Sequence, residues 1–518
     1  MSSSVASQQG QLQEVVPNSV RPGAARSRSW LWLAIATVLL LFANGANNIS
    51  LAAWLAPWFL LRFVRGRGVW SGLVAAYLLL MAAFMFQFRG MVPIPGIGYY
   101  VFLFSFGIPL VLPYAADRIL SQRLNGLPST LVFPTAFVVT EYLVSLGPYG
   151  SWGSVAYTQF GNLTLLQLLS ITGLWGITFL VAWFASMGNW LWEKGWDSKP
   201  ARTGAIVYAA ILLAVLLLGG ARLGVFPATS PTVRVASISR RKVQPEPSDM
   251  AWRHLLTNQA TPAELEEVRA GANAVDSDLL ARAEREMQAG AKIVFWGEGN
   301  APVLKTDEPA LLARGRELAG KYQVYLGMAL ATWNVGQNPS LENKLVLIKP
   351  DGEIAWEYFK ARPVPGGEAA ISITKDGKLR SLDTPYGRLS SVICFDADFP
   401  QLLAQAGALG ADVVLDPSND WPAIDPWHTQ MASYRAIEQG FNLIRHTSQG
   451  LAAAYDYQGH RLAAMDHYQA IDQTLVAQVP TKGMRTIYSQ AGDWFAWACV
   501  AVLAALIVAA TRRKPRQA

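Results

Sequence analysis

The chain has 518 residues, about three times the length of a typical domain, so we expect more than one structural unit. Charged residues make up 15% of the chain and apolar residues 52%, which excludes a disordered protein, a collagen and a soluble nucleic-acid-binding protein. The charges are unevenly placed, since only 14 of them lie between Ser29 and Arg222. We therefore predict an N-terminal membrane domain followed by a mostly soluble domain.

Eight apolar stretches are candidates for membrane-spanning helices, each of which needs about 20 apolar residues to cross the hydrocarbon core. The tail of residues 1–28 is Ser/Gln/Pro-rich, and no small-residue cleavage site follows the first apolar run, which indicates an anchor rather than a cleaved signal peptide. We thus expect a disordered cytoplasmic tail at 1–28, a membrane domain at 29–226, an external domain at 227–485 and a last span with a basic tail at 486–518. The apolar stretches are 30–46, 51–64, 69–88, 98–116, 129–147, 164–191, 203–221 and 494–510.

Basic residues predict how these spans are oriented. With eight spans, both termini and every second connection lie on the same side, and that side carries 15 basic residues, Arg62, Arg65 and Arg67 among them. The other side has only Arg89 and Arg222 near the spans. Because cytoplasmic loops carry an excess of Lys and Arg, we expect cytoplasmic termini and an external 227–485 domain at a bacterial inner membrane. The net charge of +7 therefore reflects topology and not a nucleic-acid partner.

Glu141 falls within the fifth apolar stretch. An acidic side chain in hydrocarbon is costly and suggests a function, but it is also found linking helices through hydrogen bonds. The aromatic and glycine-rich segment that follows, residues 147–162, is typical of a membrane interface, although a substrate-facing rim is the alternative. We favour the interfacial interpretation for Trp152 and leave both interpretations open for Tyr157.

The second half alternates strand and helix patterns. Asp351-Gly352 between the strand patterns at 345–349 and 354–358 predicts a hairpin turn. Alternation over this length indicates one α/β domain. The five histidines lack ligand spacing and the two cysteines cannot form a multi-cysteine site, so we expect no metal and no other cofactor. Strand patterns lie at 232–239, 292–296, 324–329, 344–349, 389–393 and 413–415, and the clearest helical patterns at 262–289 and 310–321.

Four reactive side chains follow predicted strands: Glu298, Lys360, Glu368 and Cys394. In α/β folds, functional sites gather at the carboxyl ends of strands. A thiol needs a base to become a nucleophile, and the negative tetrahedral intermediate that follows needs a cation, so Glu298 and Lys360 suit Cys394. Taken singly, each has a structural explanation, such as a core cysteine or a solvated strand end. Their combination and order favour catalysis.

The order Glu298, Lys360, Cys394 resembles the triad of the nitrilase (carbon–nitrogen hydrolase) superfamily. A multi-span N-terminal part, a single closing span and the stretches Gly173–Leu180 and Trp427–Ala432 extend this likeness over nearly the whole chain. In this combination the chain resembles the apolipoprotein N-acyltransferase family. The resemblance implies a helical membrane domain of about eight spans joined to an extracytoplasmic nitrilase-like αββα sandwich.

The resemblance also implies roles for the residues that match. Cys394 would be the nucleophile, Glu298 the general base and Lys360 the oxyanion stabiliser, while Glu368 would orient the lysine or the incoming amine. Members of the family move an acyl chain from a phospholipid, through a cysteine thioester, to the α-amino group of an apolipoprotein's diacylglyceryl-cysteine. The further candidates for substrate contact are Phe395, Asp396, Asn419, Trp427, Glu141 and Tyr157.

This sequence departs from the family pattern at the triad. Gly297 precedes Glu298 where the family usually has proline, and Phe395 and Asp396 follow Cys394 where tyrosine and glutamate are usual. These differences concern the choice of lipid or acceptor. Two alternatives stay open: a membrane-bound amidase that uses water, for which we expect a polar, open cleft, and a degenerate paralogue that serves as a binding partner. The oligomeric state is not indicated.

Overall fold

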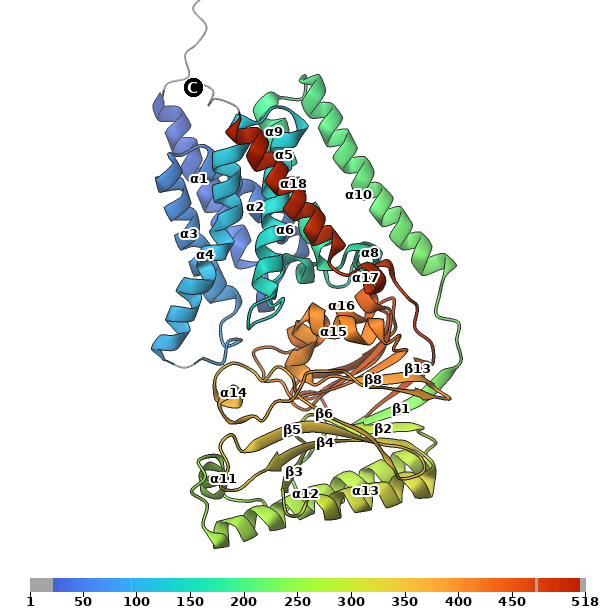
Figure 1. Cartoon of the computed structure of the whole chain (residues 1–518). Helices are drawn as coiled ribbons and strands as arrows, with labels where there is room; N and C mark the ends of the chain where they lie inside the picture. The colour runs from blue at the N-terminus through green and yellow to red at the C-terminus, as the bar shows by residue number, and fades with distance from the viewer. Residues whose placement is uncertain (1–21, 95, 471–473, 513–518) are drawn as a thin grey trace, which may run out of the picture.

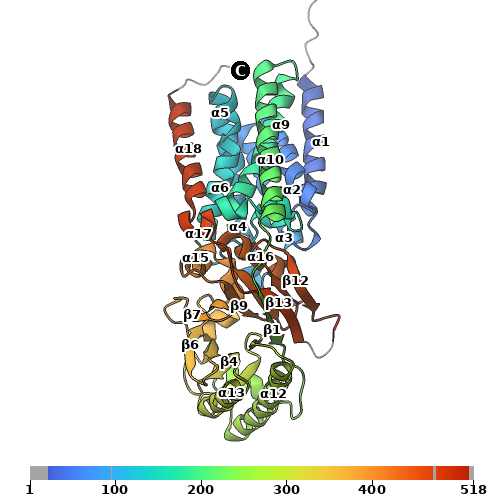
Figure 2. The same cartoon turned by 90° about the vertical axis from the view of Figure 1, so that its right-hand side faces the viewer.

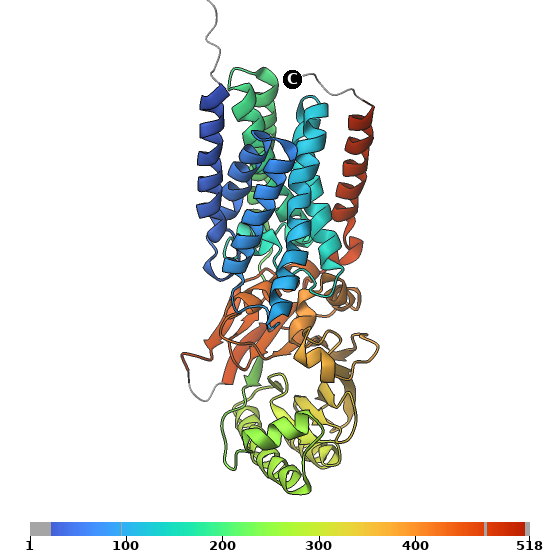
Figure 3. The same ribbon diagram turned by 90° about the vertical axis from the view of Figure 1, so that its left-hand side faces the viewer.

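The computed structural model describes residues 22–94, 96–470 and 474–512. A bundle of helices stands on an α/β domain, and the start of α1 and the end of α18 both lie at the end of the bundle away from that domain (Figure 1). Views from the two sides show the same arrangement (Figures 2 and 3). Residues 1–21 of the predicted tail lie outside the described residues, and α1 begins at Pro22, earlier than the first predicted span.

Long apolar helices build the bundle. Within the described residues, six are long and apolar enough to cross a membrane: α3, α4, the α5–α6 pair, α9, α10 and α18. The other two predicted spans correspond to α1 and α2, which pack against each other. The bounds are α1 Pro22–Leu41, α2 Ser50–Arg65, α3 Val69–Gln87, α4 Ile97–Leu120, α5 Leu127–Thr130, α6 Val132–Ser145, α9 Leu174–Lys194, α10 Lys199–Val225 and α18 Trp494–Thr511.

The predicted stretch 164–191 is divided rather than continuous. Its first part forms two short helices, α7 (Leu163–Leu166) and α8 (Leu169–Thr172), and only α9 has the length of a span. Gly173 lies between α8 and α9. Its φ is +63°, a conformation that residues other than glycine rarely adopt. A Cβ at this position would lie 2.5 Å from the ring of Tyr488, so the α/β domain contacts the break directly.

Residues 147–162 form a buried loop between the bundle and the α/β domain. The loop contains a 3₁₀ turn, η3 (Val155–Gln159), and Ser151 donates to the carbonyl oxygen of Asp398 from both its N–H and its hydroxyl, at 2.8 Å each. Gly150 lies so close to that oxygen that a Cβ would be 2.4 Å away. The loop thus packs against the α/β domain through Ser151 and Gly150, while the interfacial interpretation, which was favoured for Trp152, stays a prediction.

Two mixed sheets form the centre of the α/β domain. In the described part of the chain, the first has the order β13-β1-β2-β4-β5-β6 with β3 beside β4, and the second β12-β11-β10-β9-β8-β7. The predicted hairpin joins β5 and β6, which pair antiparallel. The strands are β1 Thr232–Ile238, β2 Ile293–Trp296, β3 Ala301–Leu304, β4 Tyr325–Trp333, β5 Leu341–Ile348, β6 Ile354–Phe359, β7 Ser381–Thr384, β8 Gly387–Ser391, β9 Val413–Ser418, β10 Asn442–Thr447, β11 Leu451–Tyr455, β12 Arg461–Asp466 and β13 Thr474–Pro480.

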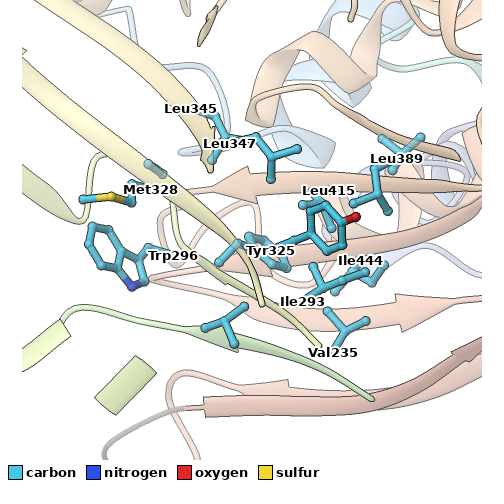
Figure 4. Packing of buried hydrophobic residues seen from close by; sticks show 14 of the residues in the cluster. Val235, Ile293, Trp296, Tyr325, Met328, Leu345, Leu347, Leu389, Leu415 and Ile444 are labelled. Atoms are coloured by element: carbon cyan, nitrogen blue, oxygen red, sulfur yellow. The ribbon is translucent and has the colours of Figure 1, made fainter. Parts of the chain in front are cut away.

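Helices cover the outer faces of the two sheets, which gives the predicted αββα layers. On the side away from the bundle lie α12 and α13, and on the side toward it α15 and α16 (Figure 1). The start of α12 is fixed by a capping box between Thr261 and Glu264. Side chains from both sheets, among them Leu345, Leu415 and Ile444, share one buried cluster (Figure 4). The helices are α11 Asp249–Leu256, α12 Pro262–Gln288, α13 Glu308–Tyr322, α14 Gly367–Ile371, α15 Pro400–Ala408, α16 Trp427–Gln439 and α17 Ile487–Ala491.

Candidate active site

The backbone turn at Cys394 is held by a buried ion pair. Cys394 opens the 3₁₀ turn η4 (Cys394–Asp398) and has a φ of +53°, which residues other than glycine rarely adopt. Its N–H donates to Asp416 Oδ1 at 2.8 Å, and Arg445 Nη1 donates to its carbonyl oxygen at 3.3 Å and to Asp416 Oδ2 at 2.6 Å. Such a conformation persists only where surrounding contacts enforce it, as Asp416 and Arg445 do here.

Lys360 is the centre of a buried network of charges. It follows β6, and its Nζ donates to Glu298 Oε1 at 2.7 Å and to the two oxygens of Glu368 at 2.9 and 2.8 Å. Asn343 on β5 donates from Nδ2 to both carboxylates, at 2.7 Å to Glu298 and 3.1 Å to Glu368. Asn343 is not among the residues predicted from the sequence. The sequence signal that could have found it is the polar run Glu342-Asn343-Lys344, which in the structure lies within the buried strand β5.

Electrostatics favours a neutral thiol beside a charged ammonium in the resting site. Burial raises the pKa of the Cys394 thiol, Glu298 raises it further, and Lys360 opposes them without reversing the shift. For Lys360, burial lowers the pKa, but Glu298, the thiol and Glu368 outweigh it, so the pKa lies well above its usual value. Cys394 therefore needs a base before it can act as a nucleophile.

Cys394 lies at the junction of two cavities. One is lined mainly by apolar side chains from the membrane bundle and the α/β domain. The other is a polar chamber whose walls include Glu298, Lys360 and Glu368. The apolar cavity is lined by Met91, Val92, Pro93, Ile94, Phe102, Tyr149, Trp152, Val364, Pro365, Cys394, Phe395, Trp421, Ile424 and His428.

The candidates next to the triad have different surroundings. Phe395 lines the apolar cavity, and Asn419 lines the polar chamber with its carbonyl oxygen 3.9 Å from Cys394 Sγ. Asp396 lines neither cavity and is fully buried. It accepts hydrogen bonds from Tyr358 Oη at 2.8 Å, from the Arg362 N–H at 2.8 Å and from its own turn. Asp396 thus holds the Cys394 turn against the segment after Lys360.

Three further candidates lie away from the triad. Trp427 and Tyr157 line neither of the two cavities at Cys394, and both pack in the cluster between bundle and α/β domain. Glu141 borders separate cavities inside the bundle. It accepts hydrogen bonds from Ser154 Oγ at 2.8 Å, Thr178 Oγ1 at 2.7 Å and the backbone of the buried loop. The structure thus places Glu141 as a link between α6, that loop and α9.

A group of possible metal ligands meets at Cys394. Ligand atoms of Cys394, Asp420 and His428 lie within 4.8 Å of one another. The two ring nitrogens of His428, however, lie 2.7 Å from Asp420 Oδ1 and 3.1 Å from Asp398 Oδ1. Burial and Arg445 lower the pKa of His428, but the two carboxylates raise it more, to about 9. Arg445 Nη2 also lies 2.8 Å from His428 Nδ1. Both ring nitrogens are thus engaged by charged neighbours, and a guanidinium lies beside Nδ1, so this donor set does not suit a metal cation.

Comparison with known proteins matches both halves of the chain. The apolipoprotein N-acyltransferase N-terminal domain matches residues 26–187, and the carbon-nitrogen hydrolase family matches residues 259–488. An apolipoprotein N-acyltransferase from Geobacter metallireducens is 26% identical over 94% of this chain and 96% of its own. One from Rhodopseudomonas palustris is 26% identical over 91% and 87%. Among solved structures, an amidase from Nesterenkonia sp. is 18% identical over 50% of this chain and 93% of its own, with a TM-score of 0.38.

Proposed function

Because this chain belongs to the apolipoprotein N-acyltransferase family, we propose that it moves an acyl chain from a membrane phospholipid to the α-amino group of an apolipoprotein's diacylglyceryl-cysteine. One observation carries the phospholipid donor. Cys394 opens both to a polar chamber with a base and a cation and to an apolar cavity that the membrane bundle helps to line. This arrangement suits a long acyl chain whose ester lies at the thiol.

The first half-reaction forms a thioester. Glu298 takes the proton from Cys394 Sγ, and the thiolate attacks the carbonyl carbon of the lipid ester. Lys360, held protonated between two carboxylates, stabilises the oxyanion of the tetrahedral intermediate. When the intermediate collapses, the C–O bond breaks, and the lysophospholipid alkoxide leaves with the proton from Glu298. The acyl chain stays on sulfur and lies in the apolar cavity.

The second half-reaction transfers the acyl chain to nitrogen. The neutral α-amine of the acceptor attacks the thioester, and Glu298 takes one of its protons. The C–S bond then breaks, an amide forms, and the thiolate regains the proton from Glu298. Water competes with the amine for the thioester, and the apolar wall beside Cys394 limits its access.

A water-using amidase is less well supported. The expectation for it was a polar, open cleft at the thiol, which the polar chamber provides, but an amidase does not account for the apolar cavity on the bundle side of Cys394. The relatives named above are N-acyltransferases. We further propose that the catalytic domain faces the outside of a bacterial inner membrane, where diacylglyceryl-cysteine proteins and phospholipids both arrive by lateral diffusion.

The test uses full-length protein in liposomes with a phospholipid and a diacylglyceryl-cysteine peptide. Mass spectrometry should find an acyl adduct on Cys394 and N-acylated peptide, and Cys394→Ala should abolish both. Glu298→Gln should slow adduct formation by about 10²- to 10⁴-fold, the usual contribution of a general base. An adduct that decays only to free fatty acid would support the hydrolase instead, and no adduct from folded protein would refute the phospholipid donor.

A further inference from the structure

A third cavity borders the polar chamber. It shares Glu298, Gly299 and Asn419 with the polar chamber. It shares no residue with the apolar cavity, and none of its lining residues belongs to the bundle. Glu298 thus lines both the polar chamber and the third cavity, while Cys394 lines the polar chamber and the apolar cavity.

Consecutive basic residues after β1 form one wall of this third cavity: Arg240, Arg241 and Lys242. Arg241 lies 2.5 Å from Asp278. Arg240 and Lys242, by contrast, have no carboxylate within 4.0 Å among the residues that the structure describes. The acidic residues of the wall are Glu246 and Glu298, and Glu298 shares Lys360 with Glu368. Arg240 and Lys242 are thus the two cations of the wall that are available to an anionic group.

The basic segment is held in place relative to the base of the triad. The N–H of Arg240 donates to Asn300 Oδ1, and Asn300 Nδ2 donates to the Glu298 carbonyl oxygen at 2.9 Å and to Ser448 Oγ at 2.6 Å. Burial lowers the pKa of Arg240, and Glu246 and Asp276 oppose this shift without reversing it, so a further anionic group would offset the remaining effect of burial. A preorganised cationic wall beside Glu298 is suited to an anionic group of whatever molecule reaches Glu298.

The position of this wall favours the acceptor over the phospholipid. The acceptor amine must reach Glu298, and the polypeptide continues from the same cysteine that carries the amine. The acyl chains of either lipid need apolar surroundings, which lie on the other side of Cys394. A polypeptide that leaves the chamber past Glu298 and Gly299 enters the basic cavity.

Resting on the function proposed above, we propose that Arg240 and Lys242 bind carboxylate side chains in the polypeptide that follows the lipidated cysteine of the acceptor. The enzyme then prefers acceptors with Asp or Glu in this segment. The preference arises in the second half-reaction, because the first does not involve the acceptor.

The experiment compares diacylglyceryl-cysteine peptides of one length that carry Asp, Asn or Lys after the cysteine. With full-length enzyme in detergent, we expect the KM for the Asp peptide to be about 3- to 10-fold below that for the Asn peptide, the scale of two partly exposed ion pairs, and the gap to shrink in high salt. The double variant Arg240→Gln/Lys242→Gln should raise the KM for the Asp peptide and bring the ratio near one. Lys378→Gln, an exposed lysine outside the cavity, is the matched control.

A charge-reversal variant keeps the proposal testable if the double variant does not fold. Lys242→Glu at this exposed position should shift the preference toward the Lys peptide. Equal KM values for all peptides with wild-type enzyme would refute the proposal. A slower release of lysophospholipid in the double variant would assign the wall to the phosphate of the donor and would also refute it. If wild-type enzyme N-acylates the Asn peptide, the proposed function stands whatever the charge preference.

Discussion

At the scale of single residues, the site depends on charges whose effects on Cys394 oppose one another. Glu298 is the proposed base, but its negative charge also raises the pKa of the thiol, while Lys360 lowers it. Glu298 therefore disfavours a standing thiolate and removes the proton only as substrate reacts. Glu368 holds Lys360, and Asn343 holds Glu298. Because Lys360 contacts both Glu298 and Glu368, we expect it to stay in place when one of these two carboxylates is replaced by an amide.

The opposing effects predict how the thiol titrates. In wild-type protein, alkylation of Cys394 by iodoacetamide should rise with pH to a midpoint well above about 8.5, the ordinary pKa of cysteine. Glu298→Gln removes a negative neighbour and should move the midpoint to lower pH, while acyl transfer falls. Alkylation rates against pH, with Cys394→Ala to correct for Cys499, measure both. A midpoint that rises in Glu298→Gln would contradict this electrostatic account.

Gly297 explains one departure from the family pattern. A Cβ there would lie 2.5 Å from Ser448 Oγ and 3.0 Å from Asn300 Nδ2, so this chain has no room for a side chain before Glu298. Gly297→Ala should destabilise the protein by about 1–3 kcal/mol, the usual cost of overpacking, and displace Glu298. Thermal melts and adduct formation are the measurements. Adding Ser448→Ala should recover part of the loss, and a Gly297→Ala protein with unchanged melting and activity would exclude the contact.

Among the helices and strands, those with a local sequence signal were predicted, whereas roles that depend on long-range contacts were not. The strands that lead to Glu298, Lys360 and Cys394 were all predicted, since alternating apolar runs and the Asp351-Gly352 turn are local signals. Asn343 was missed because its role comes from β5 pairing with β6, which places it beside carboxylates from two other segments. The contact between the loop of residues 147–162 and the Cys394 turn joins segments about 250 residues apart, and no local pattern encodes it.

That loop contact is open to a test with a matched control. Gly150 and Gly161 both have positive φ, +57° and +92°, so an alanine is strained at either site. Only at Gly150 would the new Cβ meet the carbonyl oxygen of Asp398, whereas nothing lies within 4 Å of it at Gly161. Gly150→Ala should therefore slow Cys394 acylation several-fold more than Gly161→Ala, and stability should fall by about 1–3 kcal/mol. Equal effects would show that the contact does not position the turn.

At the scale of the whole molecule, the two halves share one interface and do not behave as tether and enzyme. Leu174, the first residue of α9, donates its N–H to Glu438 Oε1 at 3.0 Å, so a residue of α16 caps a helix of the bundle. Arg435 of the same helix donates to Tyr157 Oη at 2.6 Å. Tyr157 and Trp427 thus belong to the joint that sets the apolar cavity against Cys394.

The same architecture predicts the orientation in the membrane. At the basic end of α2, Arg65 pairs with Asp117 of α4 at 2.7 Å and Arg62 pairs with Glu193 of α9 at 3.1 Å. The start of α1 and the end of α18 lie at the end of the bundle opposite the α/β domain (Figure 1). Because positive loops stay in the cytoplasm, we expect this end inside and the α/β domain outside. In a Cys394→Ala/Cys499→Ala background, an impermeant maleimide should label Lys378→Cys in intact spheroplasts but Asp197→Cys, between α9 and α10, only after permeabilisation. The reverse pattern would place Glu298, and with it the amine-accepting side of the site, in the cytoplasm, and the positive-inside argument would fail for this chain.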